Sequence, residues 1–203
     1  HGQAFSGLTM NAEKNEIRNH SMEILSDDWA VLTKHTFELK RRDGRWEKQI
    51  RQSYDRGHAA AILPFDPRRG TVLLVRQFRL PTFLQGVKMP LIEACAGLLD
   101  DNDPETCIRL ETEQELGYRL GPVRRIYDIY MSPGSVTERL SFFVAEYSPG
   151  DRFSDGGGDF EEGEDIEVLE MPLSEAMALI ESGEIIDAKT VMLVQYAVLK
   201  GIC

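Results

Sequence analysis

Cysteine and histidine are scarce in this sequence. Three cysteines, Cys95, Cys107 and Cys203, occur among 203 residues, together with four scattered histidines. An odd number of cysteines without metal-ligand spacing favours reduced thiols over a disulfide framework, and the histidines add no zinc signature. The scarcity therefore argues against a fold that is stabilised by disulfides or by structural zinc.

Long apolar runs and an excess of positive charge are also missing. No run reaches about 18 apolar residues, and the start of the chain lacks the basic-then-apolar order of a signal peptide, so we expect no membrane partner and a cytoplasmic protein. The net charge is −11. Because nucleic acids are bound mainly through Lys and Arg, we expect no nucleic-acid partner. An acidic protein that acts on a phosphorylated small molecule would need a divalent cation between its carboxylates and the phosphates.

The length of the chain allows a core domain with a small N-terminal addition. The first ten residues, HGQAFSGLTM, show no periodicity and do not begin with Met. We therefore assign residues 1–21 to an N-terminal extension that is partly an expression remnant. Residues 22–57 are predicted to form a β arm, and residues 58–203 the main domain.

Strand patterns dominate the chain, with one helix between strands and others near the end. This order predicts an α+β fold with helices around a mixed sheet. Residues 81–90 are expected to be a loop, and the Gly- and acid-rich residues 149–164 a flexible one. The predicted strands are 29–32, 36–39, 45–54, 59–63, 71–78, 92–96, 123–130, 140–147 and 166–171, and the predicted helices are 104–116, 174–183 and 190–199.

The helix at 104–116 carries the most informative pattern. Asp103 can cap its start and Gly117 can take the left-handed position after its end. Glu111 and Glu115 are spaced i and i+4, which places both carboxylates on one face of the helix. Two glutamates on a helix face are usually a solvated surface. Their mutual repulsion nevertheless favours a hard divalent cation between them.

Several segments together resemble a known family. The stretch from Ala96-Gly-Leu-Leu to Glu111-Thr-Glu-Gln-Glu-Leu-Gly-Tyr118 resembles a Nudix box, the loop-helix-loop of the Nudix hydrolases. Further segments are similar to the ADP-ribose/GDP-mannose pyrophosphatase branch, and most of all to GDP-mannose hydrolases. They are Val75-Arg-Gln-Phe-Arg79, Leu91 to Leu99, Tyr130-Met-Ser-Pro-Gly134 with Glu138, and Glu164-Asp-Ile-Glu-Val168. The resemblance covers roughly residues 22 to 200.

This resemblance implies a Nudix fold, an α/β/α sandwich with a mixed sheet, preceded by the β-strand arm. It also implies a metal-dependent hydrolase that cuts the pyrophosphate bond of a nucleotide sugar of the GDP-mannose or ADP-ribose type. The implied cofactor is Mg²⁺, with Mn²⁺ as the alternative ion. Its ligands would be the Ala96 carbonyl, Glu111, Glu115 and Glu164, and the same three glutamates would be catalytic. Glu164 would supply the final metal ligand or a base that activates water.

The resemblance implies substrate contacts as well. Arg51 and Arg79 would hold phosphate or nucleotide, Trp29 would stack on the base, and Glu138 and Lys189 would contact nucleotide or sugar. For the two arginines a surface salt bridge remains the alternative, and Trp29 could simply pack the arm onto a core. Because the arm commonly contributes to a dimer in this family, a homodimer is implied. The segment Ala96, Gly97 and Leu98 would line the substrate.

Three positions depart from the family pattern. Asp103 stands where Glu is usual, Leu110 where Arg or Lys is usual, and Gln114 where the first Glu of a pair is expected. Arg109 could partly replace the cation that Leu110 lacks. Gln114 matters most, because an amide can ligate a metal but carries no charge and cannot act as a base. The alternative hypothesis is therefore a catalytically weakened Nudix-fold protein that binds or senses nucleotide sugars.

Overall fold

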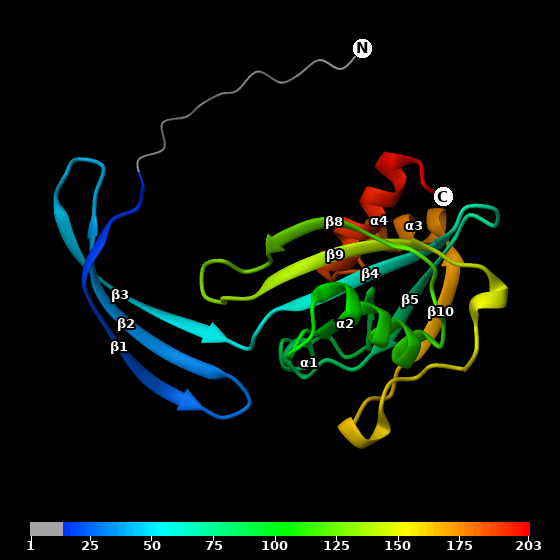
Figure 1. The fold of residues 1–203 in the computed structure, drawn as a ribbon, viewed down its shortest axis with the longest axis horizontal. Coiled ribbons are helices and arrows are strands. Elements are labelled where there is room, and N and C mark those ends of the chain that lie inside the picture. The colour runs from blue at the N-terminus through cyan, green and yellow to red at the C-terminus, as the bar shows by residue number, and fades with distance from the viewer. Residues whose placement is uncertain (1–13) are drawn as a thin grey trace, which may run out of the picture. The chain divides into compact units, whose positions relative to one another are not determined.

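The computed structural model describes residues 14–203, apart from the side chain of residue 162, and divides the chain into two compact units (Figure 1). The first unit ends at Asp55 and the second comprises Arg56–Cys203. Most of the N-terminal extension expected at residues 1–21 lies outside the described residues. In the described part of the chain, no helix is long and apolar enough to cross a membrane.

The first unit is a three-stranded antiparallel sheet in the order β1-β2-β3. Its strands are β1 Ile17–Asp27, β2 Val31–Lys40 and β3 Trp46–Asp55. The strands predicted at 36–39 and 45–54 are confirmed. The strand predicted at 29–32 is wrong at its start, because Trp29 lies in the turn between β1 and β2.

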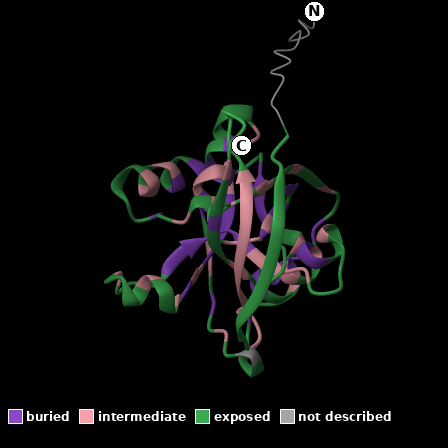
Figure 2. Cartoon of the chain, turned by 90° about the vertical axis from the view of Figure 1, so that its left-hand side faces the viewer, coloured by how far each residue is buried: buried purple, intermediate pink, exposed green. Residues whose placement is uncertain are grey.

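Sequence reasoning named no separate strand at β1, although residues 22–27 lay in the predicted β arm, and it placed residues 17–21 in the N-terminal extension. All residues of β1 are exposed, so its side chains do not alternate between a buried and a solvated face (Figure 2). Period-two alternation is the signal by which a half-buried strand is recognised, and β1 does not carry it. The strand pairs with β2 along its length, aided by exposed ion pairs such as Lys34 with Glu23.

The second unit is built on a seven-stranded mixed sheet. The strands β10-β5-β4-β9-β8 follow one another across it, with β6 beside β5 and β7 beside β4. Only β4 and β9 pair in parallel, and the other pairs are antiparallel. The strands are β4 Ala59–Asp66, β5 Thr71–Gln77, β6 Leu91–Glu93, β7 Cys95–Leu98, β8 Val123–Tyr130, β9 Arg139–Glu146 and β10 Glu167–Pro172.

Helices cover both faces of this sheet, so β4 is buried at every position. Along β4, residues Ala59, Ala61 and Leu63 join one core cluster, which includes side chains of α3 (Leu173–Ser182) and α4 (Ala188–Lys200). Ala60 and Ile62 join a second cluster, which includes side chains of α2 (Pro104–Glu111). The alternation produces two cores on opposite faces and confirms the predicted α+β sandwich around a mixed sheet.

The sheet opens between β4 and β5, and this opening positions the candidate site. The two strands pair with each other only at Phe65–Val72 and Asp66–Thr71. Beyond that point the chain segment 91–98 occupies the space, first pairing with β5 as β6 and then with β4 as β7. The switch occurs at Ala94, so Glu93 and Ala96 lie at the split in the sheet.

The predicted helix 104–116 is confirmed, with one difference in its last turn. The Asp103 carboxylate accepts hydrogen bonds from the backbone N–H groups of residues 105 and 106. Gly117 ends the helix with φ of 76°. Residues Thr112–Leu116 form a π-helical turn, labelled η1, and such turns are frequent at functional sites. The loop expected at 81–90 instead begins with a five-residue helix, α1 Leu80–Leu84, which is too short to show helical periodicity.

The acidic loop predicted to be flexible is anchored near its middle. It includes two short 3-10 turns, η2 Pro149–Asp151 and η3 Phe160–Glu162. The N–H groups of Gly157 and Gly158 donate to the carbonyls of Glu115 and Gln114, at 2.9 and 3.2 Å. A Cβ atom on Gly156 would overlap the Glu115 carbonyl. The glycines therefore allow the loop to lie directly against the end of η1.

Replacing Gly117 by alanine should destabilise the protein more than the same change at Gly183. Both glycines have positive φ, 76° and 80°, so each replacement costs about 1–2 kcal/mol of backbone strain. A Cβ on Gly117 would also overlap the Ser154 carbonyl, whereas around Gly183 nothing lies within 4 Å. We expect a further loss of about 1–3 kcal/mol for Gly117→Ala, measured by urea denaturation. Equal losses would show that the loop does not press on the helix end.

Candidate active site

Glu115 lies at the centre of the candidate site and is almost completely buried, with 2% of its surface exposed. One oxygen accepts a 3.3 Å hydrogen bond from the backbone N–H of Ala96 in β7. Burial raises the pKa of Glu115 to about 8, helped by the negative charges of Glu111 and Glu164, against the lowering effect of hydrogen bonds from Cys95 and Ala96. A buried carboxylate with acidic neighbours needs a positive charge to ionise fully at neutral pH.

Two glycines near Glu115 leave room for the carboxylates of Glu111 and Glu164. A Cβ atom on Gly97 would overlap the carboxylate of Glu111, so glycine at position 97 leaves room for that carboxylate where it lies. In the same way, a Cβ on Gly158 would overlap the carboxylate of Glu164. Glu164 also accepts a 2.9 Å hydrogen bond from the N–H of Asp159. The structure thus brings the charges of Glu111 and Glu164 close enough to act on Glu115.

The donors fit a hard divalent cation by their chemistry. All of them are oxygen atoms, the ligand type that Mg²⁺ prefers, and burial together with the charges of Glu111 and Glu164 raises the pKa of Glu115. Among residues 14–203, however, no three His, Cys, Asp or Glu side chains are already grouped as a metal site. The metal ligands Ala96, Glu111, Glu115 and Glu164 therefore remain a prediction.

A second buried carboxylate, that of Glu93, binds two cationic side chains. Its oxygens accept two 3.0 Å hydrogen bonds from the guanidinium of Arg79 and one of 2.8 Å from the ammonium of Lys189. Burial raises the pKa of Glu93, but Arg79 and Lys189 outweigh this effect and hold the pKa below its usual value. The negative charges of Glu93 and Glu115 both raise the pKa of Arg79, against the lowering effect of burial. Arg79 is therefore bound to Glu93 and is also close enough to feel the charge of Glu115.

The start of α4 is tied to the same point of the sheet. The hydroxyl of Thr190, which is fully buried, accepts a 2.7 Å hydrogen bond from the N–H of Ala94. It donates in turn to Asp187, the N-cap of α4, at 2.6 Å. Asp187 also pairs with Lys189 at 3.0 Å. These contacts fix the first turn of α4 against the β6–β7 junction, which brings Lys189 to Glu93.

The remaining predicted substrate residues lie elsewhere in their units. In the first unit, Trp29 is 68% exposed and Arg51 donates to the neighbouring carbonyl of residue 50. In the second unit, Glu138 is buried and pairs with Arg56 at 2.5 Å. Leu98 is half-buried at the end of β7. Their assignment to the substrate is neither supported nor opposed by these contacts.

The suggestion that Arg109 replaces the cation missing at Leu110 is wrong. Arg109 binds Glu105 one turn earlier and the carbonyls of residues 120 and 121, so its guanidinium is directed toward the start of the helix and the segment after it instead of toward Glu115. Leu110 is 53% exposed, and the Gln114 side chain is exposed too. A basic residue that interacts electrostatically with Glu115 is Arg79, which comes from a different segment.

Sequence reasoning missed Glu93, Asp187 and Arg56. The signal for Glu93 was present, because a single acidic residue interrupts the apolar run Leu91-Ile-Glu-Ala-Cys95. A lone charge inside a buried strand needs a partner. The sequence could not show that its partners are Arg79 and Lys189, since both are distant in the chain.

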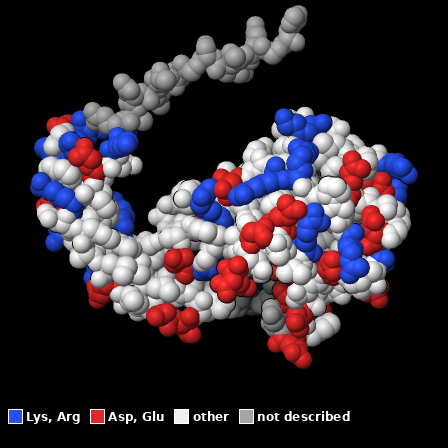
Figure 3. Space-filling view, viewed as in Figure 1, with Lys and Arg blue, Asp and Glu red and all other residues white. Residues whose placement is uncertain are grey.

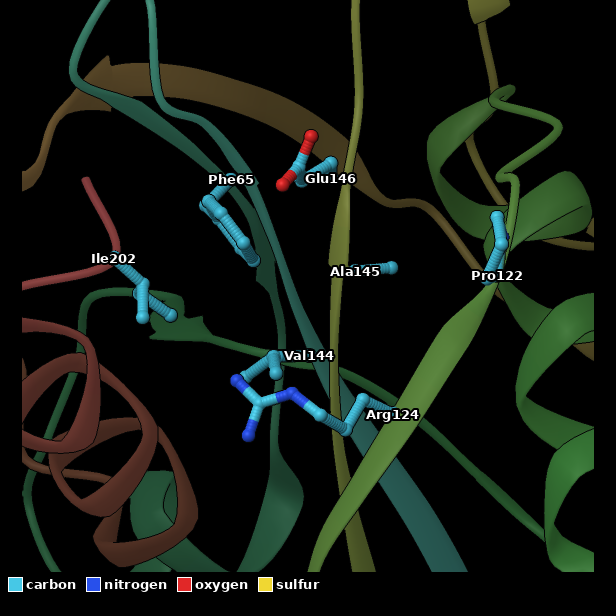
Figure 4. Close-up of a pocket in the computed structure, with 7 residues that line it drawn as sticks. All are labelled: Phe65, Pro122, Arg124, Val144, Ala145, Glu146 and Ile202. Atoms are coloured by element: carbon cyan, nitrogen blue, oxygen red, sulfur yellow. The ribbon is translucent and has the colours of Figure 1, made fainter. Parts of the chain in front are cut away.

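The surface carries side chains of both charge signs, and it also has a pocket. Acidic and basic side chains are interspersed over the face seen in Figure 3, in spite of the net charge of −11. The pocket in Figure 4 contains none of the predicted site residues. It is lined by Phe65, Pro122, Arg124, Val144, Ala145, Glu146 and Ile202.

Comparison with known families accounts for this geometry. Residues 55–194 match the family described as NUDIX domain, and residues 16–54 match the GDP-mannose pyrophosphatase NudK N-terminal domain. The chain belongs to the Nudix hydrolase family. Members of the Nudix family generally use divalent metal ions, in agreement with the oxygen-rich group around Glu115.

Individual relatives in the Nudix family are similar over most of the chain. A GDP-mannose pyrophosphatase from Pectobacterium atrosepticum is 53% identical over 180 residues, which cover 88% of this chain and 92% of the relative. A GDP-mannose pyrophosphatase from Escherichia coli O9:H4 is 50% identical over 175 residues, which cover 86% of this chain and 91% of the relative. A crystal structure of an ADP compounds hydrolase matches with a TM-score of 0.70 at 18% identity. The match covers 94% of this chain and 98% of that chain, and it supports the fold alone.

The stability of the metal-free protein should fall as the pH rises from about 4.5 to about 8 because of Glu115. Its pKa is raised from 4.5 to about 8 in the folded state, so folding takes up a proton in this window and the stabilising contribution is lost above it. Mg²⁺ should therefore raise the melting temperature more at pH 8.5 than at pH 6. In Glu115→Gln, the fall of stability with pH and the difference between the Mg²⁺ effects at the two pH values should both be smaller, as measured by differential scanning fluorimetry. An unchanged pH dependence in this variant would contradict the role given to Glu115.

Proposed function

We propose that this chain hydrolyses the pyrophosphate bond of GDP-mannose and releases GMP and mannose 1-phosphate. The observation that carries the proposal is the identity of 50–53%, over 86–88% of the chain, with relatives named GDP-mannose pyrophosphatase. The buried carboxylate of Glu115, flanked by the charges of Glu111 and Glu164, supplies a site suited to this chemistry. ADP-ribose, whose diphosphate is the same, is the substrate to compare.

Mg²⁺, or Mn²⁺ in its place, would be held by the Ala96 carbonyl, Glu111, Glu115 and Glu164. A bound divalent cation neutralises the diphosphate and lowers the pKa of the attacking water. Glu164 belongs to the loop that rests on the end of η1, and from there it completes the ligand set or accepts a proton from water. The Gly97–Leu98 backbone lines the same space.

The cations beside this group bind the substrate in the proposed enzyme. The guanidinium of Arg79 is bound to Glu93, and 41% of the Arg79 side chain is exposed. It contacts a phosphate of the substrate, and Lys189 contacts the second phosphate or the sugar. Glu138, held by Arg56, contacts a hydroxyl of the nucleotide or the sugar.

The arm provides the remaining contacts and a dimer interface. Trp29 stacks on the base, and Arg51 binds phosphate. The apolar side chains of Ile17, Met22 and Ile24 are more than half exposed on β1, which supports a second copy of the chain as the partner. The proposed enzyme is a homodimer and works in the cytoplasm.

A second function, binding of nucleotide sugars without efficient turnover, is favoured by Gln114 and Leu110. At both positions the family pattern has a charged residue and this chain does not. A binding protein would form a complex with GDP-mannose and release no products. The enzyme proposal ranks above it because the relatives with half-identical sequences are named for hydrolysis.

The direct test is release of GMP from GDP-mannose with and without Mg²⁺, measured by chromatography, with ADP-ribose run beside it. Wild-type protein should cleave GDP-mannose only with the metal. Glu115→Gln should lower kcat by at least about 100-fold, because it removes the central ligand of the proposed site. Glu113→Gln is the matched control on the same turn, since Glu113 pairs with Arg119 on the surface. Binding of GDP-mannose without products would instead favour the second function.

Gln114→Glu should lower the Mg²⁺ concentration needed for half-maximal activity. A carboxylate at position 114 adds negative charge beside Glu111 and Glu115, and cation affinity rises with the charge of the ligands. We expect a shift of about tenfold in a Mg²⁺ titration of the GDP-mannose reaction. An unchanged Mg²⁺ titration would mean that position 114 takes no part in holding the metal. The side chain of Gln114 is exposed in this structure.

A further inference from the structure

The cations assigned to the substrate are fixed by a carboxylate that has no role in the reaction so far. Arg79 follows β5, Lys189 begins α4, and both side chains meet at Glu93 in β6. Three segments far apart in the sequence are therefore joined at one side chain. Glu93 is 2% exposed, whereas the side chains of Lys189 and Arg79 are 15% and 41% exposed. The carboxylate thus lies beneath the two cations.

The hydrogen bonds of Glu93 determine the orientation of both cations. Oε1 accepts from Nε of Arg79, and Oε2 accepts from Nη2 of the same guanidinium, each at 3.0 Å. Such a two-point contact fixes the plane of the guanidinium, which a single contact does not. Oε2 also accepts from Nζ of Lys189 at 2.8 Å. A second carboxylate, Asp187, holds Lys189 from the helix side at 3.0 Å.

Stability alone does not explain a carboxylate at this position. A buried ion pair contributes little net stability compared with well-packed apolar side chains, because the desolvation of both charges offsets their attraction. Its geometry, however, is well defined. Without Glu93, the guanidinium of Arg79 would lose both hydrogen bonds that fix its plane. Glu93 therefore holds Arg79 in a defined orientation beside Lys189.

We propose that Glu93 is a positioning residue that presents Arg79 and Lys189 as one rigid pair of cations to the diphosphate of the substrate. The inference rests on the proposed function, because it takes the two cations as phosphate ligands. Glu93 does not touch the substrate. It acts through the orientation of its two partners.

The test compares Glu93→Gln with wild-type protein in binding and in turnover. Binding of GDP with Mg²⁺, measured by calorimetry, should weaken about 10- to 100-fold, because a displaced guanidinium no longer meets the phosphate. In steady-state kinetics with GDP-mannose, KM should rise by a similar factor, while kcat changes less. GDP binding needs no turnover. If wild-type protein hydrolyses no nucleotide sugar, the proposed function fails. The GDP affinity of Glu93→Gln compared with that of wild-type protein still tests whether Glu93 positions the two cations.

Glu170→Gln is the matched control. Glu170 also holds an arginine by two hydrogen bonds, to Arg69 at 2.5 and 3.0 Å, but that arginine precedes β5 whereas Arg79 follows it. Its replacement should change the melting temperature and leave GDP affinity and KM within about twofold of wild type. Loss of an ion pair as such would affect both variants alike. Loss of positioning should affect only Glu93→Gln.

A double-mutant cycle with Arg79→Ala shows whether Glu93 acts through Arg79. In that background, the effect of Glu93→Gln on GDP affinity should shrink at least about threefold, since the group that it positions is gone. Fully additive effects, or a Glu93→Gln variant with wild-type GDP affinity and KM, would overturn the proposal. Where Glu93→Gln does not fold, Glu93→Asp keeps the charge and withdraws it by one methylene. That variant should weaken GDP binding, and wild-type affinity would overturn the proposal as well.

Discussion

Two buried glutamates with opposite surroundings organise the second unit of this protein. Glu93 and Glu115 are each 2% exposed, so both lose the hydration that an ionised carboxylate has in water. Glu93 regains the lost stabilisation from Arg79 and Lys189, and its pKa lies below the usual value. Glu115 has acidic neighbours instead, and its pKa rises to about 8. The charge of Glu93 is compensated within the protein, whereas Glu115 has no such compensation and its proton is held more tightly.

The split in the sheet makes this contrast possible. Because β6 pairs with β5 and β7 with β4, the segment 91–98 passes through the middle of the sheet and carries Glu93 and Ala96 to the same opening. The face covered by α2 supplies Glu115, and α4 supplies Lys189 at the edge of the opening. A continuous β4–β5 ladder would have filled this space with backbone hydrogen bonds and left no place for either carboxylate.

Close backbone contacts hold the acidic loop near the helix that carries the proposed metal ligands. Gly157 and Gly158 donate to carbonyls at the end of η1, which have no partner within the helix. Glu164 comes a few residues later, where Gly158 leaves room for its carboxylate. The π-helical turn and the glycine-rich loop are therefore one unit, in which each supplies the hydrogen-bond partners that the other lacks.

The sequence by itself determined the local features of the site. The cap at Asp103, the end of the helix at Gly117 and the shared face of Glu111 and Glu115 follow from residues within a few positions of one another. The resemblance of the helix and its flanking segments to a Nudix box determined the family. Strands with alternating or continuously apolar residues were also predictable, whereas β1 was not, because its side chains are exposed throughout.

Only the tertiary structure decided which residues meet. Arg79, Glu93 and Lys189 lie in three separate segments, and no local pattern links them. Closeness in the sequence was also misleading for Arg109. It is next to Leu110, yet its side chain donates to the carbonyls of residues 120 and 121. Periodicity reports which face of a helix or strand a residue occupies. The partner of a buried charge depends on how distant segments pack, and that information appears only when the sheet is assembled.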